Sequence, residues 1–128
     1  MHELVASALA GGPVQLHANQ FSSNELVYVK DLARGIASAC VQPLSDGGLF
    51  NLGSGVVTDT DTLGGHLRAA FPRVEVHTPL PVRDSYPHRP QPLGLTRVNH
   101  ALGYEPKYAV AQGIADFATE LSAGVGSG

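Results

Sequence analysis

The polar side chains best suited to chemistry gather in one short stretch: Arg83, Asp84, Ser85, Tyr86, His88 and Arg89. A guanidinium group binds phosphate or carboxylate through paired hydrogen bonds, so Arg83 and Arg89 are candidates to bind an anionic ligand. His88 and Asp84 are candidates for acid–base catalysis near neutral pH. Five prolines between residues 78 and 92 rule out regular structure there, and binding residues tend to gather on such loops. An exposed loop with ordinary solvated charges is the alternative interpretation.

Tyr86 of the same stretch and two residues outside it, Tyr28 and Asn51, are further candidates for substrate binding. Tyr28 lies in an apolar run, so we expect its side chain in the core or in the wall of a pocket. Asn51 lies at the end of an expected buried strand, where an amide side chain more often hydrogen-bonds the backbone than touches a ligand.

A glycine-rich turn at Gly53, Ser54 and Gly55 lies between an expected strand and an expected helix. It is similar to a dinucleotide-binding loop, and Glu75 follows at a suitable distance. Backbone amides at a helix N-terminus would suit a phosphate. However, Thr58 stands where the third glycine is needed for close helix packing. The pattern therefore favours a structural turn over an NAD site.

Composition excludes several classes of protein. The chain has 128 residues, a formal net charge of −3 and no basic run, so nucleic acid is not an expected partner. No stretch approaches the length of a membrane span and no signal peptide is visible, so we expect a cytoplasmic protein without membrane contact. The six histidines are not spaced as a ligand cluster, so no metal site is expected. The single cysteine, Cys40, excludes a disulfide framework.

The elements that must position these residues are organised around residues 25–55. Residues 25–29 and 49–52 are expected strands, and between them a helix begins with Asp31 as its N-cap and ends before Pro43. Its apolar stripe is Leu32, Ala33, Ile36, Ala37 and Cys40. This stripe is expected to face the core and to bury the Cys40 thiol.

The rest of the chain alternates between helical and extended patterns. We expect helices at residues 1–12, 60–71, 95–102 and 109–121, and strands at residues 13–18 and 74–77. The predicted fold is therefore α/β, a small mixed sheet with packed helices. Residues 1–121 form one domain and residues 122–128 a flexible tail. Charged residues are 15% of the chain, a low fraction that is typical of a surface covered by a partner or of one rich in uncharged polar residues.

Four segments in order resemble the C-terminal part of the extended short-chain dehydrogenases/reductases, the NAD-dependent epimerases and dehydratases that act on nucleotide sugars. The segments are LAGGPV at residues 9–14, LVYVKDLA at 26–33, FNLGSG at 50–55, and TR followed by LGYEP at 96–106. The resemblance implies the fold of the family's substrate-binding lobe, without a complete Rossmann fold. It also implies a small-molecule substrate of the nucleotide-sugar class, with an arginine such as Arg83 or Arg89 on its diphosphate.

The sequence departs from the family in several places. The family's dinucleotide fingerprint and Tyr-x-x-x-Lys catalytic pair precede these segments and are not found in these 128 residues. We therefore expect no cofactor in this chain, although the full-length family uses NAD, and no hydride transfer by the chain alone. Asn24 stands where many members carry a phosphate-contacting arginine. Gly94 stands where an acidic residue is frequent.

Two interpretations of function stay open. In the first, the chain is the substrate-binding portion of a nucleotide-sugar epimerase or dehydratase. In the second, it is a free-standing truncated homologue that acts as a cofactor-independent acid–base enzyme or as a binding or scaffold subunit. In both cases a lobe without its Rossmann half exposes an apolar face, so we expect a homodimer or a complex with a separately encoded partner.

Overall fold

The structure is a computed structural model that describes residues 1–16, 23–43, 48–77 and 91–125. The described residues form an α/β fold, which confirms the predicted class. Its elements are α1 (His2–Leu9), β1 (Val14–Gln15), β2 (Ser23–Glu25), α2 (Val29–Val41), β3 (Val57–Asp59), α3 (Thr60–Ala70), β4 (Val76–His77), α4 (Thr96–Leu102) and α5 (Val110–Val125).

The described strands form two separate two-stranded sheets. β1 and β4 are parallel, with Val14 opposite Val76, whereas β2 and β3 are antiparallel, with Asn24 opposite Thr58. The small sheet expected from the sequence thus has both kinds of pairing, divided between two sheets. Each strand is short, so the helices supply most of the surface that buries apolar side chains.

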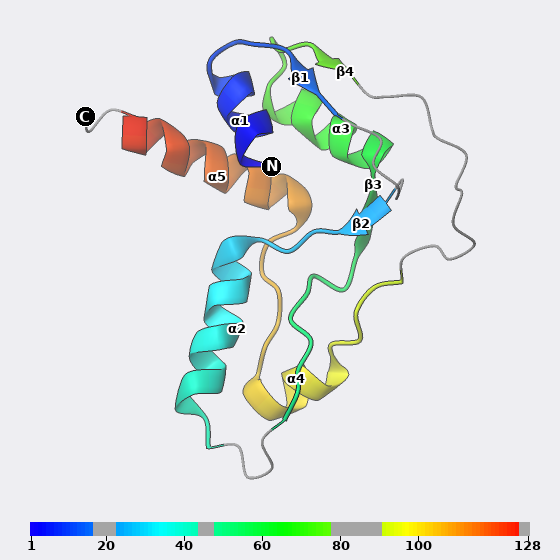
Figure 1. The fold of residues 1–128 in the computed structure, drawn as a ribbon, viewed down its shortest axis with the longest axis vertical. Helices are drawn as coiled ribbons and strands as arrows, with labels where there is room; N and C mark the ends of the chain where they lie inside the picture. Colours follow the sequence, from blue (N-terminus) through cyan, green and yellow to red (C-terminus); the bar gives the residue numbers. More distant parts are fainter. Residues whose placement is uncertain (17–22, 44–47, 78–90, 126–128) are drawn as a thin grey trace.

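The first core lies where α1, α3 and α5 pack around the parallel pair, at the top of Figure 1. Its buried members are Ala8, Val14, Leu16, Leu67, Val76 and Ile114. Leu67 of α3 has no solvent-exposed surface, and Val14 of β1 is 1% exposed. The alternating pattern of β1 and the 3.6-residue pattern of the helices bring these side chains together, as amphipathic elements do.

The second core lies where α2, α4 and residues 50–52 meet, at the bottom of Figure 1. Its buried members are Val98, Leu102 and Tyr104, with Ala39, Phe50, Leu52 and Leu95 packed against them. α2 approaches this core closely at Gly35, because a Cβ there would lie 2.7 Å from Leu52 Cδ2 and 2.9 Å from the Tyr104 ring. Any larger residue at position 35 would push α2 away.

This approach at Gly35 reverses the orientation predicted for α2. Asp31 and Gly35 are the buried residues of the helix, and most of the predicted apolar stripe lies on the opposite side. Ile36 is 52% exposed, and Cys40 is exposed rather than buried. The prediction of an inward stripe with a buried thiol is wrong, because the strongest apolar periodicity marks the face that no described part of the chain covers.

Several predicted boundaries also differ. Residues 25–29 are not one strand, since β2 ends at Glu25 and α2 begins at Val29, with Tyr28 as its N-cap. Residues 49–52 are not a strand in the structure. α5 continues beyond the predicted end at Leu121 to Val125, so the segment expected to be a flexible tail begins as helix. Gly55 in the predicted glycine turn and Gly103 after α4 are left-handed, with φ of 71° and 62°.

Candidate functional site

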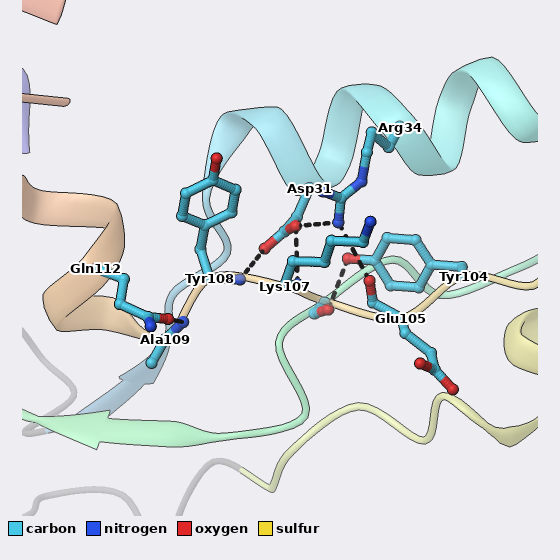
Figure 2. A network of polar contacts seen from close by, with 9 residues as sticks. Asp31, Arg34, Tyr104, Glu105, Lys107, Tyr108, Ala109 and Gln112 are labelled. Atoms are coloured by element: carbon cyan, nitrogen blue, oxygen red, sulfur yellow. Dashed lines mark hydrogen bonds and ion pairs between the residues drawn. The ribbon is translucent and has the colours of Figure 1, made fainter. Parts of the chain in front are cut away.

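Asp31 is the most buried charged residue in the described part of the chain, with no exposed surface. Its carboxylate accepts hydrogen bonds from the backbone N–H groups of Lys107 and Tyr108, each at 3.0 Å, and pairs with the Arg34 guanidinium (Figure 2). Asp31 is therefore not the N-cap of α2. It joins the first turn of α2 to the segment that leads into α5, and we refer to this group as the Asp31 clamp.

The clamp continues into neighbouring polar contacts. Arg34 also donates to the Glu105 carbonyl oxygen at 3.3 Å, and the Tyr104 hydroxyl donates to the Gly53 carbonyl oxygen at 2.8 Å. Figure 2 shows Asp31 and Arg34 reaching from α2 toward the chain at residues 104–109. Both Asp31 carboxylate oxygens accept backbone N–H groups and Arg34 Nη2 donates to a backbone carbonyl oxygen, which favours a structural role over a catalytic one.

The glycine turn is held by Glu25 at the end of β2. Glu25 Oε1 accepts from the Gly55 N–H at 2.8 Å, and Oε2 accepts from the Leu93 N–H at 2.6 Å. A side chain at position 53 would meet the same carboxylate, since a Cβ there would lie 2.2 Å from Glu25 Oε1. The backbone amide that a dinucleotide phosphate would use at Gly55 is thus bonded to a carboxylate of the chain itself.

An apolar pocket of about 110 Å³ lies between the segment before α2 and the first half of α5. It is lined by Met1, Leu26, Val27, Tyr28, Tyr108, Val110, Gly113, Ile114 and Phe117. The Tyr28 and Tyr108 rings are in contact, with centroids 4.8 Å apart. Tyr28, a candidate wall residue from the sequence, therefore lines a pocket.

A charged group stands at the edge of this pocket. The Tyr28 hydroxyl donates to Asp116 Oδ2 at 2.6 Å, and Lys30 Nζ contacts Asp116 at 2.6 Å and Glu120 at 2.9 Å. Burial, followed by the bond to Asp116, raises the pKa of Tyr28 to about 12. The bond to Asp116 also raises the pKa of Lys30, while Lys30 lowers the pKa of Asp116. Tyr28 therefore stays protonated and Asp116 stays ionised at neutral pH. These protonation states favour a structural hydrogen bond between the two side chains over proton transfer.

The structure describes two of the site residues predicted from the sequence, and these two lie on different segments. Asn51 is exposed on the segment before the glycine turn, whereas Tyr28 lies beside α5. The remaining candidates lie outside the described residues: Arg83, Asp84, Tyr86, His88 and Arg89. Sequence reasoning missed Glu25. The available signal was the position of this carboxylate, directly before the apolar run Leu26, Val27 and Tyr28.

No group of three or more His, Cys, Asp or Glu side chains in the described part of the chain is arranged to hold a metal ion. None of the described helices combines the length and the apolar character needed to cross a bilayer.

The fold is that of one part of the nucleotide-sugar epimerases and related dehydrogenases of known structure. Among its neighbours is UDP-glucose 4-epimerase from Thermotoga maritima with UDP-glucose, at a TM-score of 0.72 and 21% identity, covering 96% of this chain and 39% of that chain. WbmF from Bordetella bronchiseptica, in complex with NAD⁺ and UDP, has a TM-score of 0.76 and 19% identity, with coverages of 96% and 36%. Epimerase Mth375 from Methanothermobacter thermautotrophicus has a TM-score of 0.75 and 17% identity, with coverages of 97% and 37%.

The similarity between this chain and these structures is a similarity of fold. No family model and no curated protein matches the chain. The chain spans between 36% and 39% of the length of these structural neighbours, so most of each neighbour has no counterpart in these 128 residues. At such identities the structural likeness establishes the architecture, and activity must be argued separately.

Proposed function

We propose that the chain is the substrate-binding portion of an NAD-dependent nucleotide-sugar epimerase or dehydratase, and that it does not transfer hydride by itself. The observation that carries this proposal is the match of 96% of the chain to only 39% of an epimerase that holds UDP-glucose. The four family-like segments, in family order, support the same conclusion.

The proposed ligand is the diphosphate and sugar of a nucleotide sugar. Arg83 or Arg89 holds the diphosphate, because a guanidinium forms paired hydrogen bonds to phosphate oxygens. His88 and Asp84 move protons, while Tyr86, Asn51 and Tyr28 contribute to the wall. The glycine turn takes no part in cofactor binding in this proposal, since Glu25 already uses the Gly55 N–H. In this proposal NAD is held by the part of the neighbours' fold that has no counterpart in these 128 residues.

A second candidate function is that of a free-standing subunit, either a cofactor-independent acid–base enzyme or a binding or scaffold protein. The exposed face of α2 favours a partner in either case. Val29 is 61% exposed, Ile36 52% and Val41 80%, and such apolar surface drives association. A homodimer or a separately encoded partner would cover it. A cytoplasmic location belongs to the same proposal, because an exposed free thiol at Cys40 suits a reducing compartment.

Titration of the purified chain with UDP, followed by calorimetry and by amide NMR shifts, tests the proposal. We expect UDP to bind, and Arg83→Ala together with Arg89→Ala to weaken binding by about tenfold or more, as loss of charged hydrogen bonds does. Arg73→Ala is the matched control, since Arg73 is an exposed arginine next to α3. NAD⁺ is expected to cause no saturable change.

Two outcomes would contradict the proposal. Micromolar binding of NAD⁺ by the chain alone would show a complete cofactor site. UDP affinity that is unchanged in the double arginine variant would remove residues 83–89 from the site.

A further inference from the structure

Glu25 brings together three segments that are far apart in the sequence. It is the last residue of β2, and its two carboxylate oxygens separately accept the N–H of Gly55 and the N–H of Leu93. The two bonds, at 2.8 Å and 2.6 Å, are charge-assisted and are therefore stronger than bonds between neutral groups. One half-buried side chain thus fixes the glycine turn and the segment before α4 to the antiparallel sheet.

The glycine turn lies close to the Glu25 carboxylate. A Cβ at Gly53 would lie 2.2 Å from Glu25 Oε1 and 3.1 Å from Leu93 Cδ1. A Cβ at Gly55 would lie 3.3 Å from Leu95 Cδ1. The glycines therefore let the carboxylate and two leucines approach the turn backbone closely, which is the use that a phosphate-binding loop makes of its glycines.

Two backbone N–H groups that converge on one negative charge are the arrangement by which loops bind phosphate or carboxylate ligands. Here the negative charge belongs to the chain. We propose that Glu25 is a built-in anion that fills a backbone anion cradle formed by Gly55 and Leu93. It excludes phosphate and carboxylate ions from the turn, and it is the positioning residue that holds the start of α4.

The positioning effect extends into the second core. Leu95 precedes α4 directly, accepts the Asn99 N–H at its carbonyl oxygen at 2.9 Å, and packs against the buried Val98 and Leu102. The Tyr104 hydroxyl holds the same turn from the other side through the Gly53 carbonyl oxygen. Removal of the Glu25 carboxylate therefore frees the turn and the start of α4 together, while the Asp31 clamp stays in place.

The inference is tested on the full chain by NMR, with formate and inorganic phosphate as probes at constant ionic strength. In Glu25→Ala we expect the Gly55 and Leu93 amides to exchange with solvent at least about tenfold faster than in the unsubstituted chain, since both lose a charged acceptor. Formate should then shift both amide resonances in a saturable way and slow their exchange. In the unsubstituted chain neither probe should shift them.

Two further variants keep the result decisive. Glu75→Ala is the matched control, because the Glu75 side chain is 75% exposed, and it should leave both amides unchanged. Glu25→Gln preserves size but offers one carbonyl oxygen to two N–H groups, so one of the two amides should exchange faster even where Glu25→Ala fails to fold.

The inference is overturned by either of two results. One is exchange of both amides in Glu25→Ala and Glu25→Gln at the rate of the unsubstituted chain. The other is a response of the unsubstituted chain to formate or phosphate equal to that of Glu25→Ala. Neither measurement uses a nucleotide sugar, so its outcome does not depend on the proposed function.

Discussion

The two cores of this chain are built on different principles. In the first core the apolar faces of three helices meet over a parallel strand pair, and Leu67 is fully enclosed. In the second core the apolar stripe of α2 faces away, and the helix turns Gly35 and Asp31 inward. The first core has six buried apolar residues, whereas the second has three and lies beside side-chain hydrogen bonds to backbone from Asp31 and Tyr104.

The difference shows that amphipathic periodicity identifies a face to be covered without identifying what covers it. For α5 the covering surface is within the chain, and Ile114 is 3% exposed. For α2 it is not among the described residues, and Ile36 is 52% exposed. We therefore expect polar contacts to matter most to stability in the second region, and we propose that a partner binds at its exposed α2 face.

The largest effect is expected at the Asp31 clamp. Asp31→Ala removes the acceptor of the Lys107 and Tyr108 N–H groups and leaves Arg34 without its carboxylate. We expect a loss of about 4 kcal/mol in the free energy of unfolding, measured by urea denaturation, because each bond to a charged group contributes about 1.5 kcal/mol or more. The matched control is Asp61→Ala on the exposed first turn of α3, with an expected loss under about 1 kcal/mol.

Equal losses in Asp31→Ala and Asp61→Ala would contradict the claim that polar contacts hold the second region. Asp31→Asn should fall between the two, since a carboxamide keeps one acceptor oxygen and loses the charge.

A smaller effect is expected from removing apolar volume, and it should differ between the two cores. Leu67 and Leu102 are both buried leucines, 0% and 4% exposed. Leu67→Ala should cost about 3 kcal/mol in unfolding free energy, whereas Leu102→Ala should cost about 2 kcal/mol. The second core has fewer buried neighbours, so it can collapse more readily around the lost volume. Urea denaturation of both variants would contradict this comparison if Leu102→Ala proved equal or worse.

The two regions also differ in how well the sequence predicted them. In the first region the helices cover one another, so periodicity alone located α1, α3 and α5. The predicted end of α4 at Leu102 is also correct, and the next residue, Gly103, is left-handed, a conformation that favours glycine at helix ends.

The second region was predicted less well. Asp31 looked like an N-cap because aspartate commonly caps helices, but its acceptors serve N–H groups 76 and 77 residues away. The position of Glu25 beside an apolar run marked the residue itself, but nothing near it in the sequence indicated bonds to Gly55 and Leu93. Contacts of that length depend on the tertiary arrangement, which no spacing in the sequence encodes. Arg83 to Arg89 stays a prediction, because those residues lie outside the described part.

The smallest effect on stability should come from the outward face of α2, and it gives the sharpest contrast between the regions. Ile36→Ser places a hydroxyl where half of the side chain already meets solvent, so the unfolding free energy of the dilute chain should change by less than about 0.5 kcal/mol. The matched substitution Ile114→Ser buries a hydroxyl in the first core and should cost about 3 kcal/mol or more. Light scattering at increasing concentration should show self-association of the unsubstituted chain and about tenfold weaker association of Ile36→Ser. A large stability loss in Ile36→Ser at concentrations where the chain is monomeric would mean that the chain covers this face itself, and the contrast between the two cores would fail.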